Sequence, residues 1–159
     1  MGLGIEFILF IKVKIQSEIG VTNFGFFMPI MIGLTGGIGA GKTTVSINLA
    51  VALAMRGHKV MLLDADLGMA NAQIALGAHA PFNISHVLNG EKTLDEVMVT
   101  TKQGIRLVPG ASGLRDIAAL DTQQIASMIR AFDSVQEPVD YLVVDVAAGI
   151  APAVLDFMA

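Results

Sequence analysis

Hydrophobic and polar positions along this chain fall into blocks rather than alternating residue by residue. Short runs of uninterrupted apolar residues recur, and longer stretches with helical spacing separate them. Strands that read as continuous apolar runs are buried on both faces, which is typical of a parallel sheet covered by helices. We expect such strands at Ile30–Thr35, Lys59–Asp64, Ile105–Val108 and Tyr141–Asp145.

The segments between these strands predict helices at Thr43–Arg56, Asn83–Asn89, Thr93–Val99 and Asp121–Phe132. The first is nearly all apolar and is followed by Gly57, a residue common just after helix C-termini. Asp121 is a suitable N-cap for the last helix. Strands alternating with helices predict an α/β fold, with a mostly parallel sheet and helices on both faces.

The two ends of the chain depart from this pattern. Residues 1–30 mix apolar runs with charged residues and carry no motif. We interpret them as an N-terminal extension of unknown role, and residues 31–159 as the domain. Residues 151–159 begin another apolar helix and stop, so we expect the domain to be truncated at its C-terminus.

Length and charge limit the classes of function. A chain of 159 residues is long enough for one α/β domain with a sizeable core. Ten basic and fourteen acidic residues leave a net charge of −4, with no clustered basic face for nucleic acid. The absence of cysteine excludes disulfides and thiolate metal sites and fits a cytoplasmic location.

A charge-free stretch between Glu18 and Lys42 is apolar enough to suggest a membrane span. Its second half is rich in glycine and ends in a loop whose sequence, described next, is of a type that binds phosphate and must therefore face water. We therefore do not interpret it as a transmembrane helix.

That loop carries the central chemical signal. The residues from Gly36 to Thr43 fit G-x-x-x-x-G-K-[ST], the phosphate-binding P-loop. Glycines let backbone N–H groups point at phosphate oxygens, and the following helix directs its positive end there. Lys42 would reach the β- and γ-phosphates, and the Thr43 hydroxyl would bind Mg²⁺. We assign nucleotide contacts to Gly36, Gly37, Ile38, Gly39, Ala40, Gly41, Lys42, Thr43 and Thr44.

Aspartates follow two of the apolar strands. Asp145 ends YLVVD, the form of a Walker B aspartate, at the sheet edge where ligands bind. There it would hold Mg²⁺, and Gly149 nearby would let the backbone approach the γ-phosphate. Asp64 and Asp66 close the LLDAD segment, where a carboxylate would either hold metal or orient an attacking water.

Several ordered segments together resemble one family. GKTTVSINLAVALAMRGHKVMLLDADLGMANAQIALG, LVPGASG and DYLVVDVAAGI are similar to the MinD/ParA class of P-loop ATPases, and within it to the flagellar-number regulators of the FlhG/FleN branch. The resemblance implies binding and slow hydrolysis of ATP with Mg²⁺, and ATP-dependent homodimerisation. It also implies partners such as a flagellar GTPase, a transcription regulator or switch-complex proteins. A cytoplasmic protein, peripheral at the inner membrane face when full-length, is expected.

The resemblance also implies roles for single residues. Lys42 and Asp66 would be catalytic, with Asp66 orienting the attacking water. Thr43, Asp64 and Asp145 would form the magnesium site, and Asn71 falls at a family asparagine near the nucleotide.

Two residues depart from the family pattern. Gly37 stands where the family has a second lysine that reaches the partner's phosphate across the dimer. Val146 replaces a threonine or serine after the Walker B aspartate. These departures leave open a catalytically inactive nucleotide-binding fragment. The loop IGLTGGIGAGKTT also resembles dephospho-coenzyme A kinase, so a small-molecule kinase is a further alternative.

Overall fold

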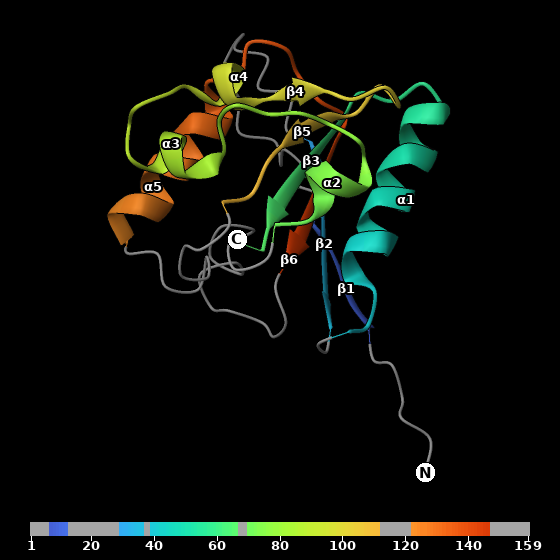
Figure 1. Cartoon of the computed structure of the whole chain (residues 1–159). Coiled ribbons are helices and arrows are strands. Elements are labelled where there is room, and N and C mark those ends of the chain that lie inside the picture. The colour runs from blue at the N-terminus through green and yellow to red at the C-terminus, as the bar shows by residue number, and fades with distance from the viewer. Residues whose placement is uncertain (1–6, 13–28, 37–38, 67–69, 112–121, 147–159) are drawn as a thin grey trace, which may run out of the picture.

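The computed structural model describes residues 7–12, 29–36, 39–66, 70–111 and 122–146. Its centre is a six-stranded sheet in the order β1-β2-β6-β3-β5-β4 (Figure 1). The strands span Phe7–Lys12 (β1), Ile30–Gly36 (β2), Val60–Ala65 (β3), Val99–Thr100 (β4), Arg106–Val108 (β5) and Tyr141–Val146 (β6). β2, β6, β3 and β5 run parallel, whereas β1 and β4 pair antiparallel with β2 and β5. The predicted mostly parallel α/β sheet is confirmed.

Helices cover both faces of this sheet, as predicted. They span Lys42–Met55 (α1), Ala72–Ala75 (α2), Ile84–Leu88 (α3), Leu94–Val97 (α4) and Thr122–Asp133 (α5). α1 and α2 lie on one face, and α3, α4 and α5 lie on the other (Figure 1). No helix within the described residues is both long and apolar enough to cross a membrane.

The central strand β3 is buried along its whole length because both of its faces contact helices. Val60 and Leu62 belong to the apolar cluster under α1 and α2. Met61 and Leu63 belong to the cluster on the opposite face, with α3 and α4. Successive side chains of a strand point to opposite faces, so an unbroken apolar run supplies both layers of the core.

The predicted boundaries that can be compared agree with the structure to within two residues, but one predicted helix includes a residue that belongs to a strand. The helix expected over Thr93–Val99 ends at Val97, and Val99 already belongs to β4. Met98 between them is extended, with φ −62° and ψ 139°, so it ends the helix. The strands β1 and β4 and the short helix α2 were not predicted.

Part of the expected N-terminal extension joins the sheet. Residues 7–12 pair antiparallel with β2, from Phe7 opposite Gly36 to Lys12 opposite Met31. β1 thus supplies a sheet partner to the strand that leads into the glycine-rich loop. The division into residues 1–30 and 31–159 stays a prediction. The expected cap Asp121 and the C-terminal stretch 151–159 lie outside the described residues.

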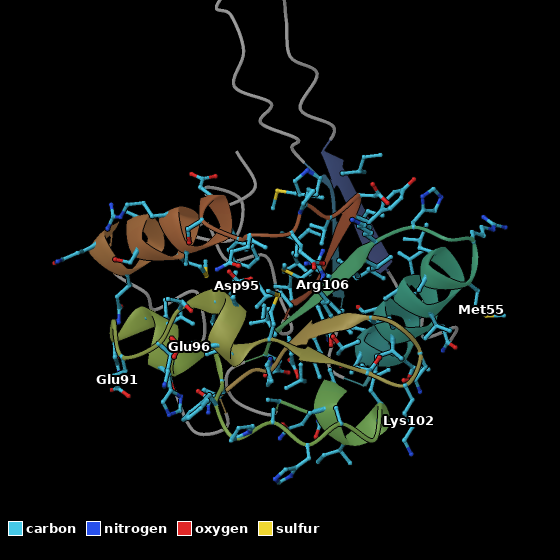
Figure 2. The ribbon with its side chains drawn as sticks, turned by 90° about the horizontal axis from the view of Figure 1, so that it is seen from above. Met55, Glu91, Asp95, Glu96, Lys102 and Arg106 are labelled. Atoms are coloured by element: carbon cyan, nitrogen blue, oxygen red, sulfur yellow. The ribbon has the colours of Figure 1, made fainter. Side chains whose placement is uncertain are left out.

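An arginine on β5 connects this strand to the segment that precedes β6. The Arg106 guanidinium on β5 donates to the backbone carbonyl oxygens of Glu137 and Pro138, both at 3.0 Å. Figure 2 shows Arg106 near the middle of the molecule, with Met55 at the outer end of α1. The contact helps to align β6, which carries Asp145, with its neighbours.

Candidate functional site

The glycine-rich loop enters α1 through backbone conformations that favour glycine. Gly39 and Gly41 have φ of 76° and 80°, in the left-handed region that other residues rarely adopt. Gly41 is the N-cap of α1, and no side chain caps the helix there. The N–H groups of the first helical turn are therefore not satisfied by a capping side chain, an arrangement suited to binding an anion.

Two aspartates lie side by side at the carboxyl edge of the sheet. Asp64 on β3 is the register partner of Asp145 on β6, and Leu34 on β2 is opposite Asp145 on its other side. Both aspartates are about 1% exposed. By strand alternation, Asp145 faces the same side as Val143, which packs with α1. The fold therefore places both carboxylates on the α1 side, level with Leu34 near the carboxyl end of the P-loop strand.

Asp145 has two unlike oxygens. Its Oδ1 accepts a hydrogen bond of 3.0 Å from the buried Ser46 hydroxyl on α1. Its Oδ2 is buried and accepts no hydrogen bond from the described residues. Burial raises the pKa of Asp145, the Thr43 and Ser46 hydroxyls act in the opposite direction, and the nearby charge of Lys42 also lowers it. The predicted Walker B aspartate is thus next to the first turn of α1.

Asp64 uses both of its oxygens to hold backbone. Oδ1 accepts the N–H of Asp66 at 3.2 Å, and Oδ2 accepts the N–H of Ala72, the first residue of α2, at 3.0 Å. Burial raises the pKa of Asp64 to about 6, the Ala72 N–H acts against this shift, and the negative charge of Asp145 adds to it. In this structure Asp64 anchors the chain on both sides of residues 67–69.

The charges of Asp66 and Lys42 both act on the buried aspartates. Asp66 raises the pKa of both Asp64 and Asp145, and Lys42 lowers that of Asp145. Asp66 is half-buried, so its carboxylate is more accessible than those of the two buried aspartates. One accessible carboxylate beside two buried ones has the exposure needed to contact a water or a ligand.

The residues around Asp145 fit a magnesium ion that is shared with a phosphate ligand. A buried carboxylate oxygen without a donor, beside a threonine hydroxyl, is the hard oxygen environment that Mg²⁺ prefers. Within the described residues, no group of three His, Cys, Asp or Glu side chains is placed to hold a metal alone. Mg²⁺ in proteins usually keeps several waters and takes phosphate oxygens of the substrate as ligands, which suits such a site.

The other predicted site residues lie around this centre or outside the described part of the chain. Gly36 ends β2, Ala40 is half-buried in the loop, and Thr44 is exposed in the first turn of α1. Asn71 is exposed immediately before α2. Three further predicted residues lie outside the described residues: Gly37, Ile38 and Gly149.

The sequence analysis missed two residues that lie against the aspartates, Ser46 and Gly110. Ser46 lies three positions after Thr43, so helical spacing could have placed it on the same face. Gly110, two residues after the end of β5, was not among the predicted site residues. Val146, a departure from the family pattern, is 5% exposed, and its side chain packs in the cluster on the opposite face of the sheet.

Gly110 allows a close approach that no other residue would permit. A Cβ at this position would lie 2.7 Å from the backbone oxygen of Asp64 and 2.9 Å from the Cβ of Ala70. We expect Gly110→Ala to lower the free energy of unfolding by about 1–3 kcal/mol, since the clash involves backbone. Urea denaturation measures this change.

Gly77→Ala is the matched control for Gly110→Ala. Gly77 has open space around its would-be Cβ but a φ of 60°, so only backbone strain of about 1 kcal/mol is expected. A Gly110→Ala protein as stable as the parent would contradict the close approach to Asp64.

The raised pKa of Asp64 predicts that stability falls as pH rises. The folded state holds this proton up to about pH 6, whereas the unfolded chain releases it near 3.8. Below the unfolded value the contribution is fully present, and it is lost as pH rises through the folded value. From about pH 4 to about pH 6 we expect nucleotide-free protein to lose stability, with an upper limit of about 3 kcal/mol for the full shift.

Unfolding free energies measured across that pH window test this prediction, with Asp64→Asn as the comparison. The difference between parent and variant isolates the titration of Asp64 from that of other groups. A variant with the same pH slope as the parent would contradict the shift.

Comparison with known proteins identifies a family match and similar relatives. Residues 30–153 match the protein family described as an AAA domain. The antiactivator FleN of Pseudomonas aeruginosa is 45% identical over 138 residues, which cover 86% of this chain and 49% of FleN. The flagellum site-determining protein YlxH of Helicobacter pylori is 35% identical over 128 residues, 80% of this chain and 44% of YlxH.

A solved structure shows the same fold. The septum site-determining protein MinD of Pyrococcus horikoshii, in complex with Mg-ADP, superposes with a TM-score of 0.62 at 28% identity. The match covers 79% of this chain and 51% of that protein. This chain therefore spans about half the length of the proteins it resembles.

Proposed function

Because this chain belongs to the AAA-domain family and is a MinD-like P-loop ATPase within it, we propose that it acts as a Mg-ATP-dependent switch in setting flagellar number or placement. The names of two relatives support the flagellar role: an antiactivator, FleN, and a flagellum site-determining protein, YlxH. The MinD structure solved with Mg-ADP supports ATP and Mg²⁺ as the cofactors.

One observation carries the proposal more than any other. The glycine-rich loop leads into an α1 N-terminus that no side chain caps, directly beside Asp145 and its partnerless Oδ2. An anion site next to a buried carboxylate oxygen suits a phosphate and a divalent cation bound together. Bound Mg²⁺ would neutralise phosphate charge at this position.

Each residue then has a proposed role. Lys42 binds the β- and γ-phosphates, and Thr43 with Asp145 holds the metal. Asp66 orients the attacking water. Asp64, proposed from sequence as a metal-site residue, supports the centre by fixing the backbone of Asp66.

The other residues predicted to contact the nucleotide have the following proposed places. Asn71 lies at the start of α2, whose first N–H Asp64 binds, so it is suited to contact the nucleotide from this side. Gly36, Gly39, Ala40, Gly41 and Thr44 would line the phosphates, and from the sequence pattern alone Gly37, Ile38 and Gly149 would contact them as well.

Switching is proposed to work through differential binding. Mg-ATP favours a state that forms a homodimer and binds partners, and hydrolysis reverts it, since a ligand shifts an equilibrium only by its unequal affinity for two states. The partners proposed from the family are a flagellar GTPase, a transcription regulator or switch-complex proteins. The proposed location is the cytoplasm, with the full-length protein at the inner membrane face.

The family's second lysine is replaced here by Gly37, and we expect this change to affect ATP hydrolysis rather than ATP binding. A dimer that lacks this cation at the partner's phosphate would hydrolyse ATP more slowly, so a catalytically inactive nucleotide-binding protein remains the second candidate. The relatives found give no support to the kinase alternative.

The test is calorimetry of the purified 159-residue chain with Mg-ATP and with Mg-ADP, followed by sedimentation of each complex. Saturable binding with a larger species only in Mg-ATP supports the switch. Binding without any change in oligomeric state between the two nucleotides favours the inactive binder. A folded chain that binds neither nucleotide would overturn the proposal.

A further inference from the structure

A buried serine on α1 contacts the Walker B aspartate from a distant part of the sequence. Ser46 is fully buried, and its hydroxyl donates to Asp145 Oδ1 at 3.0 Å across 99 positions of the chain. Serine inside a helix commonly bonds back to a carbonyl of the preceding turn. Ser46 instead donates across to the neighbouring strand, so its hydrogen bond holds a side chain rather than its own helix.

The consequence for Asp145 is an asymmetric carboxylate. One oxygen is bonded to Ser46, and the other, Oδ2, is buried and has no partner among the described residues. A buried polar atom left unsatisfied costs free energy, so native proteins rarely keep one without a ligand or a water. The Ser46 bond restricts rotation of the carboxylate and therefore determines which oxygen stays available near Thr43.

We propose that Ser46 is a positioning residue for magnesium: it orients Asp145 so that Oδ2 is presented to the metal that accompanies the nucleotide. This inference rests on the proposed Mg-nucleotide function. Residues that orient a metal-binding carboxylate typically change metal affinity by about 10–100-fold when removed. Ser46 itself does not contact the ligand in this proposal.

The test separates metal affinity from nucleotide affinity. ADP binding is measured by calorimetry in excess Mg²⁺ and again in EDTA, and the ratio of the two affinities gives the contribution of the metal. For Ser46→Ala we expect this ratio to fall by about tenfold or more, with ADP affinity in EDTA unchanged. A serine with only a packing role would alter stability or both affinities together, and an unchanged ratio overturns the inference.

Two further variants make the readout specific. Ser85→Ala removes another serine hydroxyl, which donates to Asn83 at the start of α3 and not to an aspartate, and should leave the ratio as in the parent. Ser46→Cys keeps a weaker donor of similar size and should lose less than alanine. If Ser46→Ala does not fold, Ser46→Cys is measured in its place. A cysteine variant with the same ratio of ADP affinities in Mg²⁺ and EDTA as the parent would then overturn the inference.

A double-mutant cycle tests the contact without any nucleotide. Ser46→Ala and Asp145→Ala are combined, since either change removes the hydrogen bond, and the unfolding equilibrium constants of the four proteins are compared. We expect the two changes to be non-additive by about tenfold, as for a hydrogen bond to a charged group. Additive effects would overturn the inference. A parent chain that binds no ADP while the cycle shows coupling would instead overturn the proposed function.

Discussion

Replacing Asp66 with alanine is expected to abolish ATP turnover while nucleotide binding is retained. Asp66 is half-buried at the carboxyl edge of the sheet, whereas Asp64 and Asp145 beside it are buried. Its backbone is held by Asp64 through a 3.2 Å hydrogen bond, which restricts where its carboxylate can lie. A residue in general-base position contributes about 10²–10⁴-fold to rate, so turnover should fall by that factor.

Phosphate release and Mg-ATP calorimetry on the same protein preparation measure the two effects. Asp66→Asn should behave like alanine, because the amide keeps the size of the side chain but removes the basic oxygen. Glu91→Gln is the matched control, since Glu91 lies exposed at the outer edge of the molecule beside α3 (Figure 2). Normal turnover in Asp66→Ala would identify another group as the one that orients water.

Replacing Lys42 with alanine is expected to weaken ATP and ADP binding strongly. Lys42 is the first residue of α1, after the left-handed Gly41, and its charge reaches the neighbourhood of Asp145. A charge-assisted hydrogen bond contributes about 1.5–3 kcal/mol, which corresponds to roughly 10–150-fold in affinity. The loss should be larger for ATP than for ADP, because the lysine is proposed to contact both the β- and the γ-phosphate.

Lys102→Ala is the control for charge alone. Lys102 is exposed in the turn between β4 and β5, and Figure 2 shows it pointing away from the sheet. Both substitutions remove one positive charge from the same protein, so only a local contact can make their effects differ. Equal affinities in Lys42→Ala and the parent would refute the placement of the phosphates.

The glycine-rich loop between β2 and α1 is a feature that the local sequence predicts well. Gly39 and Gly41 adopt the left-handed backbone that glycine allows at low cost, and the spacing of the loop places Lys42 and Thr43 in the first turn of a helix. Each of these features depends on neighbours within a few residues. The phosphate-binding candidates could therefore be read from the sequence before any tertiary contact was known.

The hydrogen-bond partners of Asp64 could not be predicted from neighbouring residues in the sequence. Its oxygens hold the backbone of Asp66 and Ala72, and Gly110 approaches it closely from the end of β5. The sequence placed Asp64 at the end of a strand, as observed, and suggested metal binding. Only the approach of α2 and of the β5 loop made it an anchor for the backbone.

Sequence alone determined the elements that depend on local pattern: four buried strands, the principal helices and the loop between β2 and α1. Tertiary structure decided their order, because β6 inserts between β2 and β3 although it follows both of them along the chain. That insertion brings Asp145 beside Asp64 and against Ser46. Strand order and register depend on contacts between residues far apart in sequence, and no local period encodes which strands will pair.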